Sequence, residues 1–326
     1  MTILLFLAVL LLTYANGAND NFKGTATLWG SGTLNYKQAL LLATLFTFAG
    51  SICSYFLANG LVKNFSGKGL VPDEILQTKE FVLAVAGGTG ITILLATFLG
   101  FPVSTTHGLV GALVGAGIVA AGSKVDLSVL GKTFFLPLLF SPLIAILITG
   151  ILHKIISTTK KTDYTVAGLS ITGNGSFLNP LHYVSAGVVS FARGLNDTPK
   201  LISLLLLSTY FSMPINFLLL AVVMAIGGLI NARKIAETMS KKITRLSPQQ
   251  GLLANMVTGT MVIMASKFGL PVSTTHVSVG SIYGIGLSAK TADNKEIAKI
   301  GLSWLLTLPI AAIISATIYF IISYIN

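Results

Sequence analysis

The stretch Phe101-Pro-Val-Ser-Thr-Thr-His107 returns later in the chain as Leu270-Pro-Val-Ser-Thr-Thr-His276, and the match continues in register at Gly111 and Gly280. Proline does not continue a preceding helix, and serine is a preferred residue at the start of a new one. Each copy therefore predicts a break between two helices. The free amides and the positive dipole end of the second helix would face that break.

A second pair of matching segments lies upstream of these two. Gly17-Ala-Asn-Asp-Asn-Phe-Lys23 corresponds, position by position, to Gly194-Leu-Asn-Asp-Thr-Pro-Lys200. Two motifs that recur in the same order indicate an internal duplication. We place the first repeat at residues 1–155, a connecting loop, expected to be cytoplasmic, at 156–179, and the second repeat at 180–326.

The composition indicates that the duplicated chain lies in a lipid bilayer. Of its 326 residues, 53% are hydrophobic and 10% are charged, and the mean hydropathy is +0.83. Soluble domains carry about 25% charged residues. Several apolar runs have about the length that a membrane-spanning helix requires: Met1–Tyr14, Ala39–Leu57, Phe134–Leu152, Pro214–Ile230 and Leu302–Tyr324. We therefore expect an all-α integral membrane protein.

The formal net charge is +11, from 21 Lys and Arg against 10 Asp and Glu. In a soluble protein this excess would suggest nucleic acid, but here most basic residues lie in short loops between apolar runs, so we expect no nucleic-acid partner. Cytoplasmic loops are rich in Lys and Arg, which places two basic clusters in the cytoplasm: Arg233, Lys234, Lys241, Lys242 and Arg245, and Lys154, Lys160 and Lys161. The loop from Gly60 to Glu80 has balanced charges and is placed outside.

Each repeat is expected to contain a broken first segment (Met1–Leu34; Leu181–Tyr210), a second helix, the Ser-Thr-Thr-His segment and a last helix. That gives about ten membrane segments in all. Because five per half is an odd number, the second repeat would be inverted in the membrane, as in many secondary transporters. Whether the Ser-Thr-Thr-His segments span or are re-entrant stays open, and re-entrant segments would weaken this parity argument. Both termini are predicted to lie outside the cell.

Acidic side chains recur at the ends of apolar runs, in Asn19-Asp20 and Asn196-Asp197. A carboxylate at membrane depth costs several kcal/mol, so such a residue usually marks an ion or proton pathway. An aspartate in an interfacial loop is the alternative for one copy alone. Recurrence in both halves favours the pathway.

Lys23 and Lys200 follow these aspartates by three residues, so on a helix each lysine would share a face with its aspartate. Such a cation could attract an anionic substrate, hold a coupling carboxylate ionised, or occupy the place of a coupling cation. The alternative is that the lysines extend to the lipid headgroups. Arg193, just before the second motif, either clamps an oxyanion or faces water.

Three hydroxylated residues stand at each predicted helix start: Ser104, Thr105 and Thr106, and Ser273, Thr274 and Thr275. A helix N-terminus binds anions without a full positive charge, and two of them from opposite halves could surround a tetrahedral oxyanion. A single copy would more often be a plain capping motif. His107 and His276 could relay protons or donate to the substrate, or could hold the broken helices by bonding backbone carbonyls.

These motifs resemble the signature of the inorganic phosphate transporter (PiT) family, in which a Gly-Ala-Asn-Asp type motif begins each half and a Pro-Val-Ser-Thr-Thr-His type motif follows. The resemblance covers essentially the whole chain. It implies symport of phosphate with Na⁺ or H⁺, and some members carry sulfate instead. It also implies residue roles. The coupling cation or proton falls to Asn19, Asp20, Asn196 and Asp197, and phosphate to Ser104–Thr106 and Ser273–Thr275, to which we add Lys23 and Lys200.

One departure from the family pattern concerns coupling. Many members continue the first motif with small and amide residues, whereas this chain reads Asn21-Phe22-Lys23, which places lysine in both halves. The coupling cation and the stoichiometry therefore stay open.

The sequence predicts a secondary active transporter of inorganic phosphate by cation symport. Its expected partners are phosphate, Na⁺ or H⁺ and the lipid bilayer, with a homodimer left open. We expect no cofactor other than a bound Na⁺ as coupling ion. A sulfate permease of the same family and an anion channel are the alternatives. We expect no enzyme activity, because an intramembrane hydrolase using Ser104 or Ser273 with His107 or His276 would lack a Gly-x-Ser-x-Gly elbow. No nucleotide-binding Gly-rich loop is present, so we do not expect direct coupling to ATP.

Overall fold

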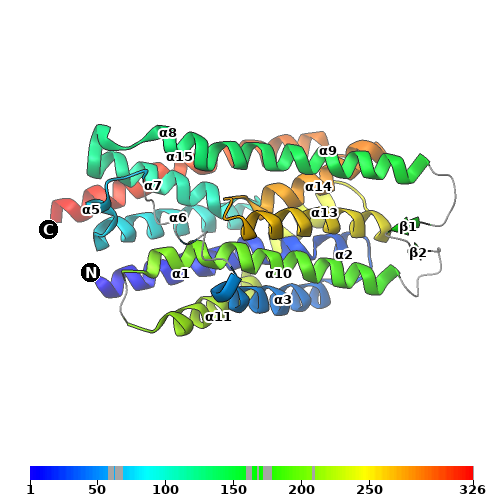
Figure 1. Ribbon diagram of the computed structural model, residues 1–326, viewed down its shortest axis with the longest axis horizontal. Helices are drawn as coiled ribbons and strands as arrows, with labels where there is room; N and C mark the ends of the chain where they lie inside the picture. Colours follow the sequence, from blue (N-terminus) through cyan, green and yellow to red (C-terminus); the bar gives the residue numbers. More distant parts are fainter. Residues whose placement is uncertain are drawn as a thin grey trace.

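The computed structural model describes residues 1–57, 62, 69–158, 164–166, 169–171, 178–207 and 210–325. Lys160 and Lys161 of the second basic cluster, and Lys63 and Lys68 of the loop from Gly60 to Glu80, lie outside these ranges. The described chain is almost wholly helical, and its long helices run roughly along the longest axis of the molecule (Figure 1). One short antiparallel pair joins β1 (Tyr164–Val166) to β2 (Leu169–Ile171).

The helices fall into two series. The first contains α1 (Thr2–Asp20), η1 (Asn21–Gly24), α2 (Ala26–Gly30), α3 (Tyr36–Leu57), α5 (Asp73–Leu76), α6 (Lys79–Leu99), α7 (Thr105–Ala121), η2 (Gly122–Lys124), α8 (Leu127–Val129), η3 (Leu130–Phe135) and α9 (Leu136–Thr158). The second contains α10 (Leu178–Leu205), α11 (Met213–Asn231), α12 (Arg233–Glu237), η4 (Thr238–Lys242), α13 (Pro248–Lys267), α14 (Thr274–Ala289) and α15 (Asn294–Ile325).

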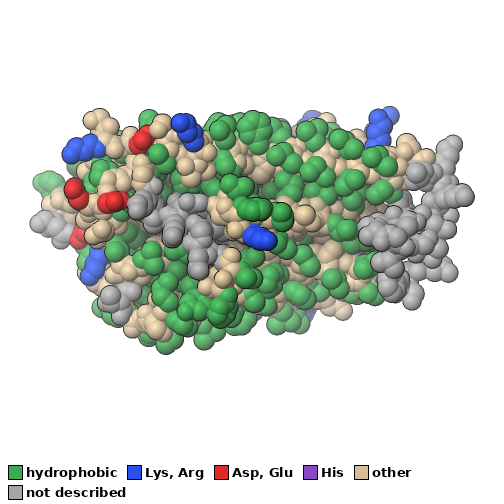
Figure 2. Space-filling model, in the orientation of Figure 1, with side chains coloured by type: hydrophobic (Ala, Val, Ile, Leu, Met, Phe, Trp, Pro, Cys, Tyr) green, Lys and Arg blue, Asp and Glu red, His purple; other side chains and the backbone are tan. Residues whose placement is uncertain are grey.

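Seven helical segments in the described ranges are long and apolar enough to cross a membrane. They are Thr2–Gly24, Tyr36–Leu57, Lys79–Leu99, Thr105–Lys124, Leu127–Thr158, Met213–Asn231 and Asn294–Ile325. Large apolar side chains such as Phe56 and Leu305 are exposed along them. Hydrophobic side chains cover much of the face in Figure 2, and most of the charged ones lie toward the ends of the molecule. These features are those of a multi-pass membrane protein.

The first segments of the two halves differ at their Asn-Asp motifs. α1 ends at Asp20, and the chain continues as the 3₁₀ turn η1 and the short α2, so this segment is broken as predicted. α10 instead continues through the second motif with Pro199 inside it, so the predicted break in the second copy is wrong. Gly24 stands where α10 has Leu201. Glycine costs about 1 kcal/mol more than alanine inside a helix and leucine very little, which favours a break in the first copy alone.

Two helical hairpins, α6–α7 and α13–α14, carry the recurring hexapeptide at their tips. Figure 1 shows α6 and α7 in the half of the molecule that contains both termini, and α13 and α14 in the other half. Both tips point toward the middle. α1 begins at the end where the termini lie, whereas α10 begins at the opposite end.

At each tip the chain turns and starts a new helix in the same way. Gly100 follows α6 with φ 81°, and Gly269 follows α13 with φ 67°, a left-handed conformation that favours glycine. Extended residues then lead to Ser104 and Ser273. Each serine Oγ accepts a hydrogen bond of 3.2 Å from the backbone amide three residues later. The predicted serine caps are confirmed, and glycine, rather than proline alone, ends the preceding helix.

Helices from the two series pack against one another in matching pairs. α1 packs along α11 and α10 along α3, while α7 packs against α15 and α14 against α9. The glycines make the close approach possible: a Cβ at Gly284 would lie 2.5 Å from the Ile146 carbonyl oxygen, and one at Gly115 would overlap the Ala312 carbonyl. Glycine at these positions lets the two helix backbones approach closely.

Candidate functional site

Four ionisable side chains from the two Asn-Asp motifs and Arg193, just before the second motif, meet between the hairpin tips. Asp20 and Lys23 come from α1 and η1, and Arg193, Asp197 and Lys200 come from α10; each is at most 2% exposed. Lys23 pairs with Asp20, and Lys200 Nζ lies 3.0 Å from Asp197 Oδ1. In their ionised forms these three cations and two carboxylates leave one net positive charge, buried. We call these five residues the charged cluster.

Lys23 binds oxygen atoms from both halves of the chain. Its Nζ donates to Asn19 Oδ1 (2.9 Å), to the Val103 carbonyl (2.8 Å), to Thr275 Oγ1 (2.5 Å) and to Asp20 Oδ1. The Val103 carbonyl belongs to the extended tip of the α6–α7 hairpin. Thr275 lies in the first turn of α14, so this one lysine links both hairpins.

Lys200 has the equivalent surroundings in the other half. Its Nζ donates to Thr106 Oγ1 (2.9 Å), Asp197 Oδ1 (3.0 Å) and the Val272 carbonyl (3.3 Å). Within the repeated hexapeptide, Val272 is equivalent to Val103, and Thr106 is equivalent to Thr275. The duplication therefore extends to the contacts of individual atoms.

Arg193 interacts with Asn16, a residue that the sequence analysis did not identify. Arg193 Nη2 donates to Asn16 Oδ1 (2.6 Å) and to its carbonyl (3.0 Å). Arg193 Nε lies 3.5 Å from Asp197 Oδ2, an ion-pair contact. Nε and Nη1 make no hydrogen bond to the described residues although they are buried. Asn16 and Arg193 each stand directly before the glycine of an Asn-Asp motif, so the register of the repeat contained the signal for this pair.

Asn16 connects the carboxylates to the tip of the first hairpin. Its Nδ2 donates to Asp20 Oδ2 (3.0 Å), Thr105 Oγ1 (2.9 Å) and Asp197 Oδ2 (3.3 Å). Thr105 Oγ1 donates in turn to Asp20 Oδ2 at 3.0 Å. Both aspartates, one from each half, are thus held by the same amide.

The asparagines of the two motifs anchor the hairpin tips. Asn19 Nδ2 donates to Thr97 Oγ1 (2.9 Å) and the Phe101 carbonyl (3.1 Å). Asn196 Nδ2 donates to the Val272 carbonyl (3.3 Å), and Ser266 Oγ donates to its Oδ1 (3.4 Å). Thr97 and Ser266 also occupy equivalent positions of the two hairpins. Both asparagines contact the charged cluster and also bind the unwound backbone around it.

The six predicted hydroxyl residues divide into three kinds of position. Ser104 and Ser273 cap α7 and α14. Thr106 and Thr275 accept hydrogen bonds from the lysines and lie within 3.4 and 2.8 Å of the valine carbonyls of the opposite tips. The remaining pair differs, since Thr105 binds Asp20 while the Thr274 side chain is buried without a hydrogen bond in the described chain. The first backbone amides of α7 and α14 have no acceptor within their own helix, and both helices begin beside the charged cluster.

His107 and His276 lie together beside the hairpin tips. Their ring centroids are 4.6 Å apart, and the ring of Trp304 lies 3.9 Å from that of His276. His276 Nδ1 is 3.2 Å from the Leu138 carbonyl. This is the type of contact expected if the histidine holds the broken helices by bonding backbone carbonyls. The two rings line an apolar pocket of about 190 Å³.

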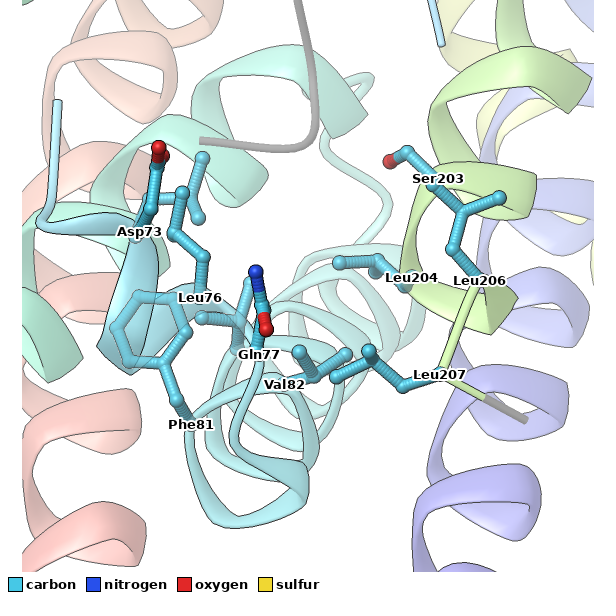
Figure 3. A pocket seen from close by; sticks show the side chains of 11 residues that line it. Asp73, Leu76, Gln77, Phe81, Val82, Ser203, Leu204, Leu206 and Leu207 are labelled. Carbon is cyan, nitrogen blue, oxygen red and sulfur yellow. The ribbon is translucent and has the colours of Figure 1, made fainter. Parts of the chain in front are cut away.

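A separate pocket of about 270 Å³ lies between α5, α6 and the end of α10 (Figure 3). Asp73 is the one ionisable side chain among its described lining residues, and the others are mostly apolar, so this pocket does not suit an anion. It nevertheless approaches the charged cluster. Ser203, which lines it, donates to the Lys200 carbonyl at 2.6 Å.

Known proteins resemble this chain over its full length. A model of the phosphate transporter family matches residues 16–315. A relative from Bacillus subtilis (strain 168) is 28% identical over 338 residues, covering 100% of this chain and 98% of its own. A relative from Rhizobium meliloti (strain 1021) is 30% identical over 331 residues, covering 97% and 95%. Each is described as a probable low-affinity inorganic phosphate transporter.

One solved structure has a similar fold over its whole length. The structure of a sodium-dependent phosphate transporter superposes with a TM-score of 0.85, covering 100% of this chain and 99% of that one, at 23% identity. The family match spans most of the residues, including both Asn-Asp motifs and both hairpin tips. The chain therefore belongs to the phosphate transporter family.

Proposed function

We propose that this protein is a secondary active transporter that carries inorganic phosphate in symport with a cation, Na⁺ or H⁺. The observation that carries the proposal is the net positive charge of the charged cluster, buried between the N-termini of α7 and α14. Burying an uncompensated charge is costly. An oxyanion at this position neutralises the charge and accepts hydrogen bonds from the helix-end amides.

The proposed phosphate ligands are the helix-end amides, Arg193 and the hydroxyl residues of the tips. Arg193 supports this role because two of its buried nitrogens, Nε and Nη1, make no hydrogen bond to the described residues, and guanidinium geometry suits tetrahedral oxyanions. Asp20 and Asp197, with Asn19 and Asn196, take the cation side of the site. The names of the relatives favour phosphate, and sulfate is the alternative substrate.

We also propose the architecture of an inverted repeat with ten membrane segments, of which α6–α7 and α13–α14 are re-entrant hairpins. Support comes from the opposite starting ends of α1 and α10 and from the matching helix pairs. Three full crossings and one hairpin per half keep the number of crossings odd. α9 ends opposite the termini, near Lys154, so a cytoplasmic position for this basic end places both termini outside the cell membrane (Figure 1).

The test is uptake of radiolabelled phosphate into proteoliposomes under an imposed Na⁺ or pH gradient. We expect saturable uptake above empty liposomes, competed by arsenate more strongly than by sulfate. Preferential competition by sulfate would assign the other substrate. Currents far above carrier turnover would indicate a channel, and absence of phosphate binding and uptake under both gradients would contradict the proposal.

A further inference from the structure

The acceptors of Lys23 form a set that is typical of a cation site. They are an amide carbonyl, a carboxylate, a backbone carbonyl and a hydroxyl, supplied by Asn19, Asp20, Val103 and Thr275. Secondary transporters with broken helices coordinate Na⁺ with unwound backbone carbonyls and helix ends of this kind. The valine carbonyl lies in such an unwound segment, at the tip of the α6–α7 hairpin.

Lys200 lies in a second set of the same chemistry. A hydroxyl, a carboxylate and a backbone carbonyl accept hydrogen bonds from its Nζ, supplied by Thr106, Asp197 and Val272. The carbonyl again comes from an unwound hairpin tip and the hydroxyl from the opposite half. The two ammonium groups therefore occupy equivalent positions in the duplicated site.

The hydrogen-bonding capacity of the lysines argues against a direct role in holding phosphate. An ammonium group has three donors, and Lys23 already has four oxygen acceptors. Arg193 differs, because its Nε and Nη1 are buried without a hydrogen bond to the described residues. The site thus separates two tasks, with the lysines compensating carboxylates and the arginine available to an anion.

Extension to the lipid headgroups is also inconsistent with the geometry. Lys23 is 2% exposed and Lys200 1% exposed, and each nitrogen binds atoms from both halves of the chain. A free cation entering either position would have to displace the ammonium or share its oxygen ligands. Repulsion between like charges in a desolvated site opposes the second outcome.

We propose that the ammonium groups of Lys23 and Lys200 are tethered cations that fill the two cation positions of the carrier, so that phosphate transport does not require Na⁺. The inference rests on the proposed function and narrows it. Tethered cations stay with the protein and do not cross the membrane with the substrate. A Na⁺ gradient therefore does not drive this carrier, and H⁺ is the symported cation.

The first test compares phosphate uptake by the unaltered protein in Na⁺ and in choline media, at one fixed pH gradient. We expect initial rates that agree within about twofold, since no site needs Na⁺ to be filled. Uptake that requires Na⁺ would overturn the inference. This comparison needs no variant, so a folding defect cannot obscure it.

The second test removes the ammonium group from one of the two proposed cation positions. Lys23→Ala leaves the carboxylate and three neutral oxygens without their cation, so we expect Na⁺ to stimulate its phosphate uptake at least tenfold. Lys200→Ala should behave in the same way. The matched control is Lys79→Ala, whose nitrogen donates to the Thr2 hydroxyl at 2.8 Å, away from the cluster. This control should keep the Na⁺ independence of the unaltered protein.

The third test measures Na⁺ binding without transport. Thermal unfolding in detergent, without phosphate, should be shifted upward by Na⁺ for Lys23→Ala and left unchanged for the unaltered protein, because a ligand that binds the folded state raises its stability. Loss of phosphate affinity in both lysine variants without any Na⁺ response would show that the lysines contact phosphate and would overturn the inference. If the unaltered protein carried no phosphate in any medium, the proposed function would fail, while a Na⁺ shift in the variants would still support the cation positions.

Discussion

The first half of the chain has Asn16 at the position where the second half has Arg193, each directly before the glycine of its motif. The lysines and aspartates beside them correspond pairwise, and so do the hairpin atoms that the lysines bind. The first half is consequently neutral, with one aspartate and one lysine, whereas the second half carries one excess positive charge. The equivalent pairs can serve a symmetric role, while the unmatched arginine supplies the excess charge that the proposed anion would neutralise.

The two halves also differ in how tightly the hairpin tips are held. Thr275 Oγ1 lies 2.8 Å from the Val103 carbonyl, and its equivalent, Thr106 Oγ1, lies 3.4 Å from the Val272 carbonyl. The tighter contacts surround Lys23, which stands on the 3₁₀ turn η1, and the looser ones surround the lysine on the continuous α10. The side of the site with the broken helix is therefore the more constrained side.

Arg193→Asn makes the two halves alike and should have the largest effect. It removes the excess charge together with two buried nitrogens, Nε and Nη1, that make no hydrogen bond to the described residues. Truncating one partner of a buried hydrogen-bonded charge pair costs about 2–5 kcal/mol, so phosphate affinity should fall by at least about thirtyfold. Isothermal titration of phosphate into detergent-purified protein measures the change.

Two further variants sharpen this prediction. The double variant Asn16→Arg with Arg193→Asn moves the guanidinium to the equivalent position in the other half, and we expect affinity to return to within about tenfold of the unaltered protein. Arg233→Asn removes a guanidinium that is 55% exposed and paired with Glu237, so its affinity should be unchanged. Normal phosphate affinity in the Arg193→Asn single variant would remove the arginine from the anion site.

Neutralising the carboxylates should have the next largest effect. Asp20→Asn and Asp197→Asn should each lower gradient-driven phosphate uptake at least tenfold, because each leaves buried cations uncompensated. The loss should be larger for Asp197, which neighbours both Arg193 and Lys200, than for Asp20, whose salt bridge is with Lys23 alone among the described residues. Initial uptake per reconstituted protein is the measurement.

The control for the carboxylates is Asp126→Asn, on an exposed turn where the carboxylate accepts a 2.9 Å hydrogen bond from the Ser128 amide. It should transport normally. Folded protein recovered from the membrane must be comparable for all three variants. Uptake equal to that of the unaltered protein in either cluster variant would exclude that aspartate from the mechanism.

Much of the fold and part of the site could be predicted from the sequence because the duplication is visible as repeated sequence motifs. The serine caps and the membrane segments follow from local residue types and spacing. The break of the second Asn-Asp segment was predicted wrongly, because the two copies share a motif but not the glycine that weakens the helix in the first copy. Gly24, in place of the leucine at 201, favours the break locally.

The contacts across the two halves could not be predicted. No local pattern indicates that the Lys23 nitrogen binds Thr275, far away in the sequence, or that the rings of His107 and His276 lie together. Such contacts depend on how the hairpins meet, which is set by packing of whole helices rather than by propensity. The Asn16–Arg193 pair could be predicted only in part. The two residues occupy equivalent positions of the repeat, but they are of different types, so a comparison that looks for identical residues does not find them.

The hydroxyls at the hairpin tips should have the smallest effects, and their order tests the difference in constraint between the halves. Thr275→Val and Thr106→Val keep the side-chain shape and remove the hydroxyl. A hydrogen bond contributes about 0.5–1.5 kcal/mol when neutral and about 1.5–3 when one partner is charged, so each change should weaken phosphate binding by roughly three- to a hundredfold. The effect should be larger for Thr275, whose oxygen lies 2.5 Å from Lys23 Nζ, than for Thr106, at 2.9 Å from Lys200 Nζ.

The matched control for these two variants is Thr317→Val, whose hydroxyl donates to the Ile313 carbonyl on the exposed face of α15 and should not affect binding. Equal losses at Thr106 and Thr275 would contradict the proposed difference in constraint while leaving the proposed anion site intact.

A wider series of variants replaces all six hydroxyl residues of the hairpin tips one at a time. Ser104→Ala and Ser273→Ala should act mainly through lost helix caps, about 0.5–2 kcal/mol of stability each. If phosphate affinity were unchanged in all six variants, the repeated motif would serve only to start two helices, and the anion would have to be held by Arg193 and the backbone amides without the hydroxyls.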